Sequence, residues 1–111
     1  MDIMDKLFVS HITTTQAQKV LLVGKGKDID YAINLALKKN ININFDLLNT
    51  DKEQISQISQ NYDLVIIVDR DLETAKKNHF ASTKLKKEGS RVVFGLCRGL
   101  FFENPKWRFL L

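Results

Sequence analysis

The sequence runs Lys19-Val20-Leu21-Leu22-Val23-Gly24-Lys25-Gly26-Lys27 directly before a helical pattern over residues 28–39. The uninterrupted apolar residues before the first glycine are typical of a strand that is buried on both faces. In residues 28–39 the apolar side chains recur at the spacing of one helix face, at Ile29, Ala32, Ile33, Ala36 and Leu37. A strand, a tight turn and a helix in this order predict the first half of a parallel crossover.

The remaining sequence repeats this rhythm. Alternating apolar residues predict a second strand over 41–47, and apolar runs predict a third over 64–68 and a fourth over 91–96. We expect a weak helix over 51–60 and a longer one from Asp71 to about Lys87. The pattern therefore predicts the α/β class: a three-layer Rossmann/flavodoxin-like parallel sheet of about four strands with flanking helices.

The chain of 111 residues is expected to form a single α/β domain, long enough to bury most of a small core. Residues 1–18 are interpreted as a short amphipathic helix over 1–12 with a polar lead-in, and residues 19–97 as a βαβαβαβ core. Residues 98–111 form an apolar and basic C-terminal tail, which we expect either to fold back or to dock on a partner.

Four residues are predicted to end or begin helices. Asp28 and Asp71 precede helical patterns, where a carboxylate can accept hydrogen bonds from free backbone N–H groups. Asn40 suits a left-handed helix stop, and Gly89 is expected to end the later helix.

Charge is unevenly distributed along the chain. Residues 1–75 hold eight Lys/Arg and eleven Asp/Glu, a net charge of −3, whereas residues 76–111 hold nine and two, a net charge of +7. Such polarity can mark an end that faces a polyanion. A lysine-rich helix that is only solvated explains the same composition, and the sequence leaves both interpretations open.

Composition argues against several classes of protein. The single Cys97 excludes an internal disulfide framework and a cysteine-built zinc site. No apolar run approaches the roughly 20 residues of a membrane-spanning helix, so we expect no membrane partner. The early Asp2 and Asp5, without a basic start, argue against a secretory signal.

The glycine loop raises the question of a cofactor. Gly24 and Gly26 fit the start of the dinucleotide fingerprint G-x-G-x-x-G, but Ile29 occupies its third glycine position. Asp46 lies near the distance at which a ribose-binding acid would stand. Asp69 follows a strand at the edge where such folds place their sites, and with Asp71 it could hold magnesium, although helix capping by Asp71 is the more economical interpretation.

Two segments resemble late parts of class I methyltransferases, residues 62–67 and residues 85–94. That resemblance implies S-adenosylmethionine binding by Gly24, Gly26 and Asp46, in a degenerate relative. The first and third strands are also similar to the adenylating ThiF and ubiquitin-activating fold.

A resemblance that keeps the same order along the chain is to the ribosomal small-subunit protein two family, over roughly residues 19–105. The first strand, its glycine loop and the following helix resemble that family's first Rossmann-type segment. Leu47-Leu48-Asn49-Thr50 is similar to a leucine, asparagine and threonine cluster before a helix, and residues 63–75 resemble a strand that ends in aspartate before an alanine-bearing helix. The closing strand and the tail with Pro105 also resemble that family.

This resemblance implies a non-catalytic component of a ribonucleoprotein, a small ribosomal subunit of the cytoplasm or the mitochondrial matrix, without cofactor or metal. The basic residues expected to approach RNA phosphates are Lys25, Lys27, Lys76, Lys77, Lys84, Lys86, Lys87, Arg91 and Arg98. The tail residues expected to dock on a neighbouring ribosomal protein or on ribosomal RNA are Phe101, Phe102, Lys106, Trp107 and Arg108. An adaptor subunit of another complex remains an alternative.

Overall fold

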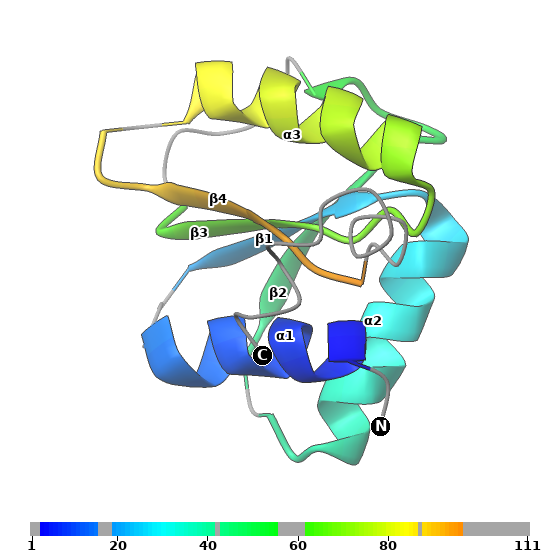
Figure 1. Cartoon of the computed structure of the whole chain (residues 1–111), viewed down its shortest axis with the longest axis vertical. Helices are drawn as coiled ribbons and strands as arrows, with labels where there is room; N and C mark the ends of the chain where they lie inside the picture. The colour runs from blue at the N-terminus through cyan, green and yellow to red at the C-terminus, as the bar shows by residue number, and fades with distance from the viewer. Residues whose placement is uncertain (1–2, 16–18, 42, 56–61, 87, 97–111) are drawn as a thin grey trace.

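A computed structural model describes residues 3–15, 19–41, 43–55, 62–86 and 88–96 of the chain. In these residues one sheet is covered by helices on both faces (Figure 1). The elements are α1 (Ile3–Thr15), β1 (Val20–Gly24), α2 (Gly26–Lys38), β2 (Phe45–Asn49), β3 (Leu64–Ile67), α3 (Leu72–Leu85) and β4 (Arg91–Phe94).

The four strands are all parallel and lie in the order β2-β1-β3-β4. Helices α1 and α2 cover one face and α3 covers the other, which makes three layers (Figure 1). The predicted Rossmann/flavodoxin-like α/β class is confirmed. Because the chain goes from β1 to β2 on one side and to β3 on the other, the carboxyl ends of β1 and β3 form the switch point where such sheets place ligands.

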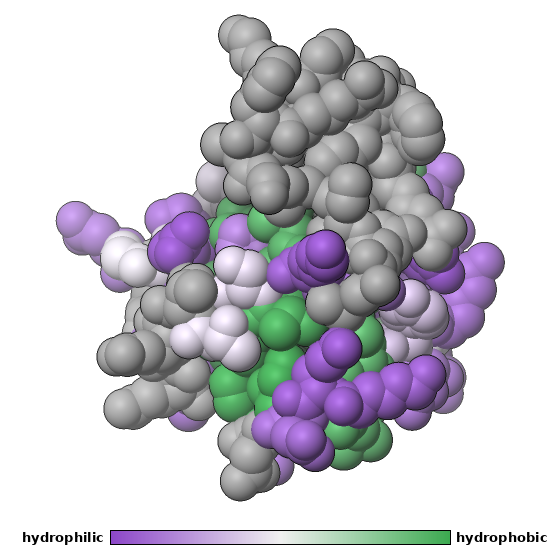
Figure 2. Space-filling view, turned by 60° about the horizontal axis from the view of Figure 1, so that its bottom comes forward, coloured by the Kyte–Doolittle hydropathy of each residue, from purple (hydrophilic) through white to green (hydrophobic). Residues whose placement is uncertain are grey.

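Helix α2 packs with a face that differs from the predicted one. Ile29, Ala32, Leu35 and Ala36 are buried, whereas Leu37 is 67% exposed. The buried face extends toward Leu35 because α1 packs beside α2 on the same side of the sheet. On this side of the molecule, apolar surface lies between hydrophilic side chains (Figure 2).

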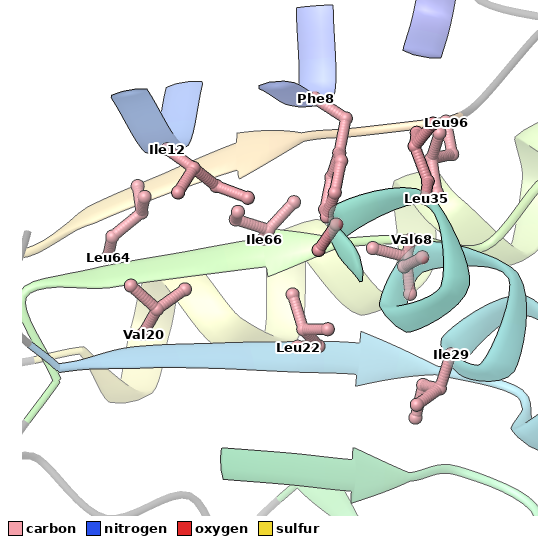
Figure 3. Close-up of a cluster of buried hydrophobic side chains, with 12 residues drawn as sticks. Phe8, Ile12, Val20, Leu22, Ile29, Leu35, Leu64, Ile66, Val68 and Leu96 are labelled. Atoms are coloured by element: carbon pink, nitrogen blue, oxygen red, sulfur yellow. The ribbon is translucent and has the colours of Figure 1, made fainter. Parts of the chain in front are cut away.

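The larger core lies under α1 and α2. Phe8 and Ile12 point from α1 toward the sheet, where they meet Leu64 and Ile66 (Figure 3). The chain after β4 passes very close to this cluster, since a Cβ on Gly95 would lie 2.7 Å from Ile66 Cγ2 and 3.2 Å from Phe8 Cδ1. Only glycine fits there without displacing core atoms. On the opposite face a smaller cluster beneath α3 is formed by Leu21, Val23, Leu48, Val65, Ile67 and Ala75.

Several predicted boundaries are confirmed. The third strand occupies the predicted apolar run, Asp71 caps α3 by accepting from Thr74 N at 3.0 Å, and Asn40 has a left-handed φ of 55°. The expectation that Gly89 ends this helix is wrong, because α3 ends at Leu85 with Lys86 as its C-cap, and Gly89, with a positive φ of 87°, lies in the turn before β4.

Other boundaries were predicted wrongly. Helix α1 continues to Thr15, through residues 13–15 that were interpreted as the start of the polar lead-in to the first strand. Strand β2 begins at Phe45, because pairing with β1 sets its position, while Ile41 and Ile43 pack against the core outside it. Residues 51–53 form a turn and a bend, and helical structure of the 3-10 type is present only from Ile55, so the expected weak helix does not begin at Asp51; residues 56–60 lie outside the described residues. Within the described chain, no helix is long and apolar enough to cross a membrane.

Asp28 was predicted to cap α2, and this is also wrong. The helix begins at Gly26, so Lys25 takes the capping position and makes no side-chain capping bond. Asp28 lies inside the first turn, where it is buried, and accepts instead from the Arg70 backbone N–H at 3.2 Å. Its carboxylate therefore joins the helix to the chain after β3.

Two buried serines provide a matched test of polar burial. Ser82 is 1% exposed and its Oγ has no partner among the described residues, whereas the Ser90 hydroxyl donates to the Tyr62 carbonyl. We expect Ser82→Ala to increase the free energy of unfolding by about 1 kcal/mol, because alanine removes an unsatisfied hydroxyl and favours the helix. Ser90→Ala should decrease it by about 1 kcal/mol. Urea denaturation of both variants checks this, and a destabilised Ser82→Ala would contradict it.

Candidate functional site

The carboxyl ends of β1 and β3 approach each other closely at the switch point. Gly24 ends β1, and a Cβ there would lie 2.9 Å from Val68 Cγ2 and 3.3 Å from the Asp69 backbone nitrogen. The glycine therefore allows the loop after β1 to pack directly on the chain that follows β3. Gly26 serves a different approach, to the end of β2, because a Cβ on Gly26 would lie 2.9 Å from Asn49 Nδ2.

Asp69 is the centre of this edge. Its side chain is fully buried and accepts hydrogen bonds from the Lys25 backbone N–H, at 3.1 Å, and from the Asn78 side-chain amide. Burial raises the pKa of the Asp69 carboxyl above its usual value, and the nearby Asp28 carboxylate acts in the same direction, although the two hydrogen bonds oppose the shift. One carboxylate thus connects the loop after β1, the end of β3 and the inner face of α3.

Other aspartates bind two further backbone donors of this edge. The Gly26 N–H donates to Asp51 Oδ2 at 3.0 Å, and the Arg70 N–H donates to Asp28 Oδ2. In phosphate-binding folds, N–H groups at the start of the first helix are left for the ligand. Here the loop N–H groups of Lys25 and Gly26 are bound by the chain's own carboxylates.

The charge of this edge disfavours an anionic ligand. A phosphate at the loop would meet the carboxylates of Asp28, Asp51 and Asp69, which repel it. The Asp71 carboxylate is also engaged, because it accepts hydrogen bonds from the backbone N–H and the hydroxyl of Thr74. These bonds lower the pKa of Asp71. Among the described residues, no three acidic, histidine or cysteine side chains are grouped as a metal site requires.

Asp46, the proposed ribose-binding residue, does not lie beside Gly24 and Gly26. It pairs with Leu21 near the start of β2, and Asn49 is the residue opposite Gly24. Three residues along a strand separate Asp46 from that position by about 10 Å. Its carboxylate accepts a hydrogen bond from the Tyr62 hydroxyl at 2.7 Å. Burial, as the larger cause, and this hydrogen bond together raise the pKa of Tyr62 to about 12.

The basic residues expected to contact RNA are divided between separate places. Lys25 and Lys27 lie at the carboxyl edge among the aspartates. Arg91 pairs with Leu64 in the sheet, so its side chain is on the same face as α1. The pKa of His11 on α1 is lowered mainly by burial and, to a smaller extent, by the charge of Arg91. The lysines that remain together are on α3 and at its C-cap, namely Lys76, Lys77, Lys84 and Lys86.

The solvent-facing side of α3 combines these lysines with an aromatic ring. His79 holds the helix to the sheet, since its ring stacks on Phe94 at 4.2 Å and its Nε2 lies 3.1 Å from the Val92 carbonyl oxygen. Phe80, the next residue, is 63% exposed, and Lys84 Nζ lies 4.3 Å from the centre of its ring. We call five exposed residues of this side the α3 outer stripe, namely Glu73, Lys76, Lys77, Phe80 and Lys84.

Sequence reasoning identified the lysines of the α3 outer stripe but missed Phe80. A single phenylalanine in a helical pattern is ordinarily a core residue, so the pattern alone does not mark it as a surface contact. The available signal was its spacing: Phe80 stands three or four residues from Lys76, Lys77 and Lys84, which places all four on one side of a helix.

The remaining predicted contact residues lie outside the described residues. These are Lys87, Arg98 and the tail residues Phe101, Phe102, Lys106, Trp107 and Arg108.

The opposite side of the molecule exposes apolar residues. Leu47 pairs with Leu22, so both side chains are on the α1 and α2 face, and Leu47 is 45% exposed at the edge of the described sheet. Leu37 is in the last turn of α2, the helix that covers this face, and is more exposed still. Figure 2 shows apolar surface on this side.

Comparisons of the chain with protein-family models, with curated proteins and with solved structures found no match.

The Asp69 carboxylate is open to direct test. Asp69→Ala removes the acceptor of two donors, the Lys25 N–H and the Asn78 amide, and we expect it to lower the free energy of unfolding by about 2–4 kcal/mol. The exposed Asp30 supplies the control, since Asp30→Ala should change it by no more than about 0.5 kcal/mol. Equal stability of the two variants in urea denaturation would show that the network contributes little.

Proposed function

We propose that this chain is a non-catalytic structural component of a ribonucleoprotein that binds RNA through the α3 outer stripe. The observation that carries the proposal is the contrast between the carboxyl edge of the sheet and the outward side of α3. The edge where the fold class ordinarily binds small molecules is closed by Asp28, Asp51 and Asp69, whereas the outward side of α3 presents Lys77 and Lys84 to solvent.

The stripe has the properties of a phosphate-binding surface. Its lysines are exposed on one helix: Lys76 and Lys77 are adjacent, and Lys84 follows Lys77 by seven residues, about two helical turns, so ammonium groups from both places can reach neighbouring phosphates. Glu73 is the one carboxylate of the stripe, and it stands at the end of the helix near the carboxyl edge. Contacts of this kind add affinity by releasing counterions and do not read sequence.

The opposite face supports a role inside an assembly. Leu37 and Leu47 expose apolar surface on the α1 and α2 side, away from the α3 outer stripe. A component that touches RNA with one face and a neighbouring protein with the other would use both. The resemblance of residues 19–105 to the ribosomal small-subunit protein two family favours a small ribosomal subunit, cytoplasmic or mitochondrial, as that assembly.

The second candidate is a degenerate methyltransferase-like domain that binds S-adenosylmethionine at Gly24 and Gly26. The close packing of glycine backbone at the switch point is the observation in its favour. The position of Asp46, opposite Leu21 and bonded to Tyr62, weighs against it, because the ribose would lack the acid that the resemblance implies.

Binding to ribosomal RNA at several salt concentrations tests the proposal. We expect the logarithm of the association constant to fall linearly with the logarithm of the salt concentration. The double variant Lys77→Gln/Lys84→Gln should bind more weakly and reduce the slope by about 0.7 for each phosphate contact that is lost.

A charge-matched control is available at the carboxyl edge. Lys25→Gln/Lys27→Gln removes the same charge from the aspartate-rich edge, and its binding should stay within about twofold of the parent protein. Equal losses in both double variants would mean that only net charge matters. Binding that is independent of salt, or micromolar binding of S-adenosylmethionine, would contradict the proposal.

A further inference from the structure

We propose that Phe80 is a stacking platform for one unpaired base, so that the α3 outer stripe selects single-stranded over double-stranded RNA. The inference deepens the proposed function and rests on it. It assigns a role to a residue that electrostatics alone leaves unexplained, since 63% of a phenylalanine is exposed in the middle of a lysine-rich helix face.

The ring is held outward by the packing of its neighbours. His79 stacks flat on Phe94, at an interplanar angle of 7°, and Asn78 is buried against Asp69. Because successive helix residues are turned by about 100°, these two inward contacts fix the outward direction of Phe80. The ring is therefore presented on a rigid support, which limits the entropy that binding must overcome.

The charges around the ring match a nucleotide. Lys84 Nζ lies 4.3 Å from the ring centre, and Lys76 and Lys77 stand one helical turn before it. A base stacked on the ring would carry its phosphates past these ammonium groups, as in surfaces that combine aromatic side chains with a cationic groove. Phe80 is 63% exposed even with the Lys84 ammonium over its ring, so a base can stack on the ring while the flexible Lys84 side chain moves aside toward the phosphate.

Single-stranded RNA is favoured over a duplex for a geometric reason. In a duplex the bases are stacked and paired, so their faces cannot reach a side chain without opening the helix. A duplex can contact the lysines only through its phosphates. The carboxylates of an acidic protein segment would satisfy the lysines as well, but Asp and Glu side chains have no flat ring to stack on Phe80.

The test compares the parent protein with Phe80→Ala, Phe80→Tyr and Phe80→Trp, binding a 12-nucleotide oligoadenosine and a 12-base-pair RNA duplex. We expect Phe80→Ala to weaken binding of the single strand by about 5- to 150-fold, the range that loss of one stacked base produces. Duplex binding should change by less than about twofold. The tyrosine and tryptophan variants should keep single-strand affinity, and binding should quench the fluorescence of the introduced tryptophan.

Each other outcome overturns a defined part of the proposal. If Phe80→Ala binds the single strand as the parent does, stacking is refuted while the salt dependence and the Lys77/Lys84 effect still support the proposed function. If an oligoglutamate of equal charge binds and Phe80→Ala weakens that binding equally, the stripe is a protein-binding surface. If the parent binds neither RNA, the proposed function fails together with the inference.

Discussion

The buried carboxylate of Asp69 is the interaction on which the arrangement of this domain depends. It lies where β3 ends and accepts from Lys25 N in the loop after β1 and from Asn78 on α3. Burial of this carboxylate is costly, as the raised pKa of Asp69 indicates. The two hydrogen bonds offset part of that cost. Because the two donors come from the glycine loop and from α3, Asp69 fixes the positions of both relative to the end of β3.

This arrangement has a consequence for function. The backbone donors that a Rossmann-type sheet ordinarily offers to a ligand at its switch point are used here for the internal connections of the fold. The same Asn78 that reaches Asp69 turns the inner side of α3 to the sheet, so Phe80 and the lysines of the α3 outer stripe face solvent. The edge at which this class of sheet often binds ligands is thus held by internal hydrogen bonds, while the outer side of α3 is exposed. The proposed RNA contacts use that exposed side.

The sequence predicted those features that local patterns determine. Apolar runs located β1 and β3, and Asp71 was recognised as a cap because its partner, Thr74, is only three residues away. It failed where a partner is distant in the chain. Asp28 bonds to Arg70, 42 residues later, and Asp46 is removed from the switch point by the pairing register of β1 and β2. Neither fact is present in a local pattern.

Backbone amide NMR spectra test the central claim most directly, because they report on the switch point and on α3 in one experiment. Labelled protein would be titrated with single-stranded RNA and, separately, with S-adenosylmethionine and with a dinucleotide. Our account predicts RNA-induced shifts concentrated at residues 76–84 and no saturable shifts at residues 24–28 with either small molecule. Saturable shifts centred on Gly24 and Gly26, with α3 unaffected by RNA, would contradict it.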